Sequence, residues 1–274
     1  MSDYCLDDKG KNDCITFTIC PMVPNYDLSL ILKKKLPRDI KDITKPTDEE
    51  IKFIRDPYPP FFTISILIKE KEKCASIDYL KEDVKNLKES PHLNEREQKK
   101  LNKFNNYLKQ KNINHKVLKN MAIIAGMFTR IVEFLTIKHH TEEIHWFPDR
   151  DAIMDISDGI ILDLVNIQCQ GTELIRGRKI PPKLRIGGED KKNNVFRFDP
   201  LVRYPDIITG VVSSIDFDTY TAQEEKHVDL FVNAILGNPR IVIMEMSPNE
   251  FKTFPLHKRI KTKNIIRASE MKNV

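Results

Sequence analysis

The stretch Glu143–Val165, EIHWFPDRDAIMDISDGIILDLV, decides the fold, because two hydrophobic patterns meet in it at one charged turn. Ile144–Phe147 is a short apolar run typical of a buried strand, and Pro148 ends it. Asp149 and Asp151 follow, and the apolar residues beyond them recur at helical spacing. A buried strand that leads through a turn into an amphipathic helix is characteristic of α/β proteins. We therefore expect an α/β domain with two carboxylates where a strand ends.

The pair Asp149 and Asp151 has two interpretations. Ligands of α/β sheets bind beyond the carboxyl ends of the strands, and carboxylate oxygens are the donors that Mg²⁺ and Mn²⁺ prefer. An Asp before a helix is also a routine cap, because its charge favours the positive end of the helix dipole. Taken alone, the pair favours the cap.

A third carboxylate shifts this balance towards a metal site. Asp206 lies in RFDPLVRYPDIITGVVSS, where it is expected to begin a helix of small and apolar residues. Gly210 follows one turn later, so this carboxylate could approach a sheet edge closely. Three acids on two element ends suffice for metal-assisted cleavage of a phosphodiester. We expect Asp149, Asp151 and Asp206 to bind Mg²⁺ or Mn²⁺ and to be catalytic, with a helix cap as the alternative for Asp206.

The order of these motifs resembles the C-terminal half of an uncharacterised bacterial family with a ribonuclease H-like fold. The segments IHWFPDRDAI, KLRIGG and LVRYPDIITGVV carry the resemblance, which covers about residues 143–216. It implies that Asp149, Asp151 and Asp206 form the acidic site. Members often open with a strand that bears the central metal carboxylate.

The first half of the chain departs from that family pattern. The strand predicted there, CITFTICPM, contains no acid. Asp13 precedes it and Asp27 lies beyond its end, so neither takes the central position. Residues 1–13 are polar and are expected to be frayed.

The remaining patterns predict one mixed sheet flanked by helices. Strands are expected near residues 14–20, 61–70, 143–147, 183–187 and 241–246. Helical periodicity fills 76–138, and its last helix is apolar enough to be buried. We therefore expect a single ribonuclease H-like α/β domain over 1–274, with a helical insertion at 76–138 and a basic tail at 252–274.

Composition limits the partners. The 274 residues carry 45 basic and 40 acidic side chains, a net charge of +5 that permits nucleic acid without requiring it. Lysines on a thinly apolar helix, and the tail, could contact phosphates: Lys99, Lys100, Lys103 and Lys109. Five scattered cysteines indicate free thiols in a reducing cytoplasm. Without a signal sequence or an apolar run near the ~20 residues of a membrane span, we expect a cytoplasmic protein and no membrane partner.

Three functions follow from these features. The leading hypothesis is a metal-dependent nuclease that cuts DNA or RNA, in phage defence or a mobile element. The alternative is a catalytically inactive binding or interaction subunit of the same fold in a larger complex, because the strand at 14–20 lacks an acid and the tail is basic; a protein partner is then possible as well as nucleic acid. An α/β enzyme acting on small phosphorylated molecules is a third reading. The histidines His139, His140 and His145 have no fourth ligand at recognisable spacing and are interpreted as a surface turn.

Overall fold

The computed structural model describes residues 1–24, 27–74, 77–89, 93–149, 182–187, 199–248 and 250–253, with short pieces between 153 and 169. The chain divides into two compact units. Unit 1 comprises Met1–Lys69, Phe147–Asp149 and Gly188–Val274, and unit 2 comprises Glu70–Trp146 and Arg150–Gly187. Helices and strands are mixed throughout, which confirms the predicted α/β class.

Within its described residues, unit 1 contains a five-stranded mixed sheet in the order β1-β2-β3-β6-β7. The strands are β1 (Ser2–Cys5), β2 (Cys14–Ile19), β3 (Phe62–Ile68), β6 (Ile241–Ser247) and β7 (Glu250–Thr253). β3 and β6 run parallel, and the other neighbours are antiparallel. The hydroxyls of Thr16 and Ser65 lie 2.9 Å apart across β2 and β3, so these buried polar groups satisfy each other.

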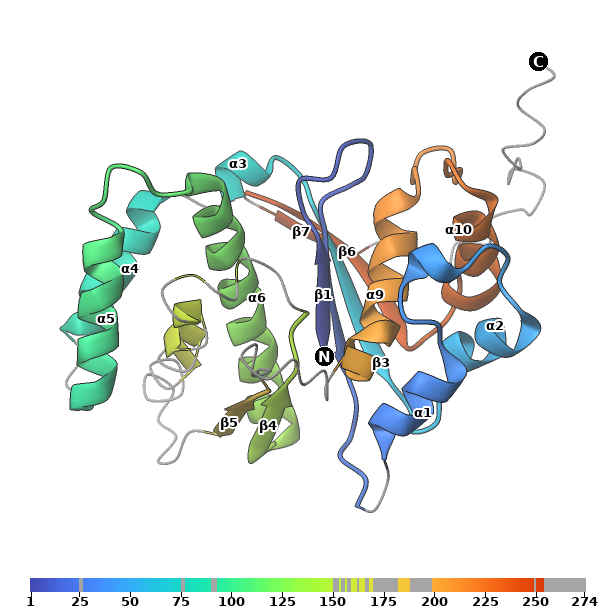
Figure 1. Ribbon diagram of the computed structural model, residues 1–274, viewed down its shortest axis with the longest axis horizontal. Coiled ribbons are helices and arrows are strands. Elements are labelled where there is room, and N and C mark those ends of the chain that lie inside the picture. The colour runs from blue at the N-terminus through green and yellow to red at the C-terminus, as the bar shows by residue number, and fades with distance from the viewer. Residues whose placement is uncertain are drawn as a thin grey trace. The chain divides into compact units, whose positions relative to one another are not determined.

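Helices cover one face of this sheet (Figure 1). They are α1 (Leu28–Lys35), η1 (Ile40–Asp42), α2 (Asp48–Arg55), α9 (Asp199–Ser214), α10 (Glu225–Leu230) and η3 (Phe231–Ile235). α9 is central, because it packs against β1, β2 and β3 and buries an apolar stripe that includes Ile207 and Val211. The Tyr204 hydroxyl donates to the Ile54 carbonyl at 2.8 Å, which ties α9 to α2.

Unit 2 is mainly helical. Its elements are α3 (Lys71–Cys74), α4 (Ile77–Lys88), α5 (Glu95–Tyr107), α6 (His115–His139), β4 (Glu143–Trp146) and β5 (Lys183–Ile186). The predicted helical segment 76–138 falls within this unit. On the buried side of α6, the ring of Phe128 stacks on Trp146 with centroids 4.0 Å apart. This contact joins α6 to β4, and the burial of many α6 side chains agrees with the apolar pattern of this helix.

Two expectations need correction. The five predicted strands do not share one sheet, because β4 and β5 pair with each other in a separate parallel sheet. Apolar alternation identifies strands but carries no information on which strands pair. In addition, α6 is long and apolar enough to meet the criteria for a membrane span, although 61% of its most apolar window is buried inside the structure. Core helices of soluble proteins pass the same test, so this is weak evidence for a membrane.

Of the predicted basic tail at 252–274, only residues 252 and 253 are described, as the end of β7.

Candidate acidic site

The segment Phe147–Asp149 lies alongside β1 in unit 1. The amide of Ser2 donates to the Phe147 carbonyl at 3.0 Å, and the amide of Asp149 donates to the Ser2 carbonyl at 2.8 Å. Ser2 is therefore paired in parallel with Pro148. Side chains alternate between the two faces of a sheet, and Asp3 and Asp149 each follow one member of this pair. Their side chains therefore lie on the same face of the sheet, opposite to the face of Ser2 and Pro148. The backbone thus places these two carboxylates side by side.

Asp3 is the buried member of this pair, with 6% of its surface exposed. It lies opposite Thr16 in the β1–β2 ladder, on the face that α9 covers. Thr209 of α9 faces the same carboxylate and lowers its pKa in part, while its hydroxyl donates to the Pro205 carbonyl at 2.8 Å. Sequence reasoning placed this segment among frayed residues and missed both the strand and its acid.

Asp206 brings a third carboxylate to the same face. It precedes Thr209 by three residues, so both side chains project from one side of α9. Burial raises the pKa of Asp206 to about 7, and the charges of Asp39 and Asp149 add to this effect. Burial also raises the pKa of Asp3 well above its usual range, followed by the charges of Asp206 and Asp149. The three carboxylates therefore act on one another electrostatically.

Asp206 does not begin its helix, contrary to both sequence interpretations of this residue. α9 starts at Asp199, so Asp206 lies in its middle, one residue after an internal proline. Its Oδ2 accepts a 2.9 Å hydrogen bond from the amide of Ile40, the first residue of η1. The carboxylate thus satisfies an amide at the start of a neighbouring helix rather than of its own.

Gly210 serves close packing, but against η1 rather than a sheet edge. A Cβ at this position would lie 2.8 Å from Cγ2 of Ile40, which is too short for van der Waals contact. Ile40 is therefore fixed twice by α9, through its amide by Asp206 and through its side chain by the bare backbone of Gly210. These two contacts hold η1 in a fixed position against α9, the helix that carries Asp206.

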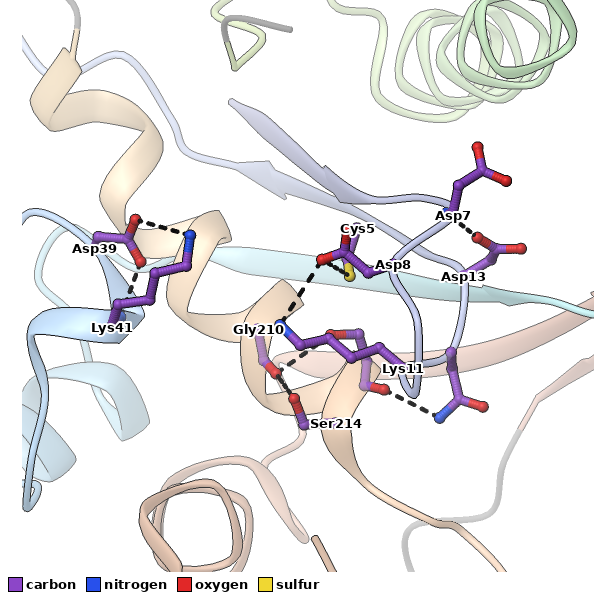
Figure 2. A network of polar contacts seen from close by, with 11 residues as sticks. Cys5, Asp7, Asp8, Lys11, Asp13, Asp39, Lys41, Gly210 and Ser214 are labelled. Carbon is purple, nitrogen blue, oxygen red and sulfur yellow. Dashed lines mark hydrogen bonds and ion pairs between the residues drawn. The ribbon is translucent and has the colours of Figure 1, made fainter. Parts of the chain in front are cut away.

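The connection between β1 and β2 is tied to the C-terminal end of α9 (Figure 2). The Asn12 side chain donates to the carbonyls of Ser213 and Ile215, at 3.2 and 2.9 Å. Asp13 accepts a 2.6 Å hydrogen bond from the amide of Asp7, whose φ of 69° is left-handed. Asp13 therefore stabilises this turn, and the place of a first-strand acid belongs to Asp3.

The second candidate for the first-strand acid, Asp27, also has a structural role. It caps α1 by accepting a 3.0 Å hydrogen bond from the amide of Leu30.

The histidines of the sequence analysis include His140 and His145. The ring of His145 lies 2.8 Å from a carboxylate oxygen of Glu143. His140 is the C-terminal cap of α6 and has a left-handed backbone conformation.

The carboxylates as they stand do not form a closed metal cage. Among the described residues, no group of three or more His, Cys, Asp or Glu side chains could hold a metal ion. The donor set nevertheless suits a hard cation, since Mg²⁺ and Mn²⁺ take carboxylate oxygens. Asp151, the remaining predicted ligand, lies outside the described residues.

A signal for β1 was present in the sequence. The turn-forming stretch DDKGKND separates YCL from CITFTI, and Gly and Asx residues between two apolar runs indicate a hairpin. The paired strand would then contain Asp3.

The scan against protein-family models found no match, and the searches of curated proteins and of solved structures gave none either.

Proposed function

We propose that this protein is a Mg²⁺- or Mn²⁺-dependent nuclease with a ribonuclease H-like sheet, and that Asp3, Asp149 and Asp206 are its catalytic carboxylates. The main support is that three acids from distant parts of the chain, the buried Asp3 and the half-buried Asp149 and Asp206, lie close enough to affect one another electrostatically. Crowding like charges away from water destabilises a fold, and such perturbed groups concentrate at functional sites. The family resemblance expects a central carboxylate on the first strand, and Asp3 on β1 would serve as that carboxylate.

The roles follow from the position of each side chain. Asp3 is the most buried of the three, and the charges of both others act on it, so it would be the shared ligand. Asp149 ends its segment beside β1, where a phosphate could reach it, and Asp151 two residues later would extend the same donor set. A bound divalent ion would supply an activated water and stabilise the leaving oxygen. Asp206 would complete the site when its side chain leaves the Ile40 amide.

The bond between Asp206 and Ile40 favours one alternative. A carboxylate that holds η1 in place has a structural role, and no metal-binding group is formed among the described side chains. The same fold could therefore serve as a catalytically inactive binding subunit, in which the Asp206 carboxylate holds η1 in place. Activity measurements separate these two functions.

The test is cleavage of single- and double-stranded DNA and RNA with Mg²⁺ or Mn²⁺. Asp3→Asn and Asp149→Asn should abolish cleavage, because an amide replaces the charged oxygen donor. Asp27→Asn is the matched control, since Asn also caps helices well and Asp27 lies outside the site. Cleavage that survives Asp3→Asn would contradict this proposal, and a wild-type protein that binds nucleic acid without cutting it would establish the inactive subunit.

A further inference from the structure

The outer side of α5 and the chain that follows it form a continuous basic surface. From Gln98 to Asn120 the sequence has seven lysines and neither Asp nor Glu. The exposed side chains of α5 and of the connection to α6 in this stretch are lysines and amides: Gln98, Lys99, Asn102, Lys103, Asn106, Lys109, Gln110, Lys111, Asn112 and Asn114. We name these residues the α5 basic surface.

The opposite side of α5 is fixed by burial. Leu101, Phe104 and Leu108 are almost fully buried, and α5 packs against α4. A capping box between Asn94 and Glu97 holds the first turn, which orients the helix from its start. The α5 basic surface is therefore presented to solvent by a helix whose rotation is determined.

Four of the seven lysines of this stretch differ clearly in their surroundings. Lys100 points inward, and its Nζ lies 2.6 Å from both carboxylate oxygens of Asp163. Lys99, Lys109 and Lys111 are exposed and make no ion pair within the described part of the chain. These three charges remain available to a partner.

The chemistry of the α5 basic surface selects its partner. Lysines interleaved with Asn and Gln match phosphate oxygens, which accept from ammonium and amide groups alike. A membrane surface would need large apolar side chains beside the lysines, and none of the exposed large hydrophobic residues lies between 93 and 120. Single-stranded nucleic acid is held largely by stacking on aromatic rings. Tyr107, whose ring stacks on the buried Phe104, is not exposed here, so a duplex is favoured.

We propose that the α5 basic surface binds the phosphate backbone of double-stranded nucleic acid. It would thereby deliver substrate to the acidic site, a consequence that rests on the proposed nuclease function. The chain enters unit 2 after Lys69 and returns to unit 1 at Phe147, two residues before Asp149. A duplex bound to unit 2 would thus be linked through the protein chain to the unit that carries the carboxylates.

The experiment measures binding in EDTA, so that its outcome does not depend on cleavage. The triple variant Lys99→Gln, Lys109→Gln, Lys111→Gln is compared with wild type by fluorescence anisotropy on a labelled DNA duplex over a range of salt concentrations. The log–log slope of affinity against salt should become shallower by roughly 2 to 3, because each lost phosphate contact removes about 0.9. The matched control, Lys33→Gln, Lys34→Gln, Lys52→Gln, removes the same charge from exposed positions of unit 1.

Three results would overturn this assignment. The slopes of the triple variant and of the control could fall equally, which would show an effect of net charge alone. Wild type could bind a single strand, or vesicles containing phosphatidylglycerol, at least as tightly as the duplex. Binding to the duplex could also be absent. Duplex binding that depends on these three lysines without any cleavage would support the surface and reject the nuclease.

Discussion

The amide of Asp149 donates a 2.8 Å hydrogen bond to the carbonyl of Ser2, the residue that precedes Asp3. The main chain, rather than either side chain, therefore holds the two carboxylates next to each other. Substituting Asn for Asp at these positions removes charge and leaves this backbone contact intact. Such variants can test chemistry and electrostatics without dismantling the site.

The first prediction concerns pH. The pKa of Asp206 is about 7 in the folded protein against an ordinary 3.8, so between these values the folded state holds a proton that the unfolded chain releases. The contribution of Asp206 to the free energy of unfolding should therefore fall as pH rises from about 4 to 7, and Asp3, whose pKa is also raised by burial, should add to the fall. Asp206→Asn should flatten this fall and stabilise the protein at pH 8 by roughly 3–4 kcal/mol, since one pKa unit is about 1.4 kcal/mol.

Urea unfolding of wild type and Asp206→Asn at pH 5 and pH 8 measures this effect. The Asn side-chain oxygen can still accept from the Ile40 amide, so η1 should keep its anchor. An equal change in stability with pH for both proteins would show that Asp206 is ionised normally.

The second prediction concerns divalent ions. Mg²⁺ or Mn²⁺ should raise the melting temperature of the wild type by offsetting the repulsion among Asp3, Asp149 and Asp206. A ligand that binds only the folded state at a hundred times its dissociation constant contributes about 2.7 kcal/mol. Asp3→Asn and Asp149→Asn should lose this increase, whereas Asp27→Asn should keep it. If Asp151→Asn also loses the increase in melting temperature, the second acid of the turn shares the ion. An equal increase in melting temperature in all variants would show that these carboxylates form no specific ion site.

The third prediction concerns Gly210. Gly210→Ala should destabilise the protein by about 1–3 kcal/mol, because the added methyl overlaps the Ile40 side chain. Ile40→Ala in the same chain should recover part of that loss, since it removes the overlapping atoms. A double-mutant cycle by chemical denaturation gives the coupling energy. If the changes in the free energy of unfolding are additive, η1 moves away from the added methyl without loss of stability, which would contradict this prediction.

The fourth prediction separates the two units. Trp146 is the sole tryptophan of the chain and lies in unit 2, so its fluorescence follows that unit. Phe128→Ala removes its stacking partner and should destabilise unit 2 by about 3–5 kcal/mol. The increase in melting temperature with divalent ions, which belongs to unit 1, should persist in circular dichroism. Loss of that increase would show that the units unfold as one.

The sequence predicted the strands and helices better than it predicted which of them pair or pack with one another. β2, β3 and β6 are apolar enough to be found from alternation alone, and the α6 pattern predicted a buried helix. β1 has the residues SDYC and pairs with β2 in a hairpin that the turn residues between them indicate, but much of its burial comes from Phe147–Asp149 and α9, which are distant in sequence. Local patterns cannot report such long-range burial.

The candidate site shows the same division. Asp149 and Asp206 were found because each stands beside an apolar run, whereas Asp3 was missed because its strand is short and polar. The bond from Asp206 to Ile40 joins residues 166 positions apart, so no local spacing could indicate it.

The position of unit 2 in the chain has a consequence for biosynthesis. β1 is made before its neighbour Phe147–Asp149, which emerges only after Glu70–Trp146 has been translated. Until then one edge of β1 has open hydrogen-bonding groups next to a charged Asp3, and an unpaired edge is a template for wrong pairing. Contacts so distant in sequence form slowly, because a long loop must close first. The nascent chain should therefore depend on early folding of unit 2 to bring Asp149 to β1, and a ribosome-bound fragment that ends before residue 147 should leave the N-terminal strand accessible to protease.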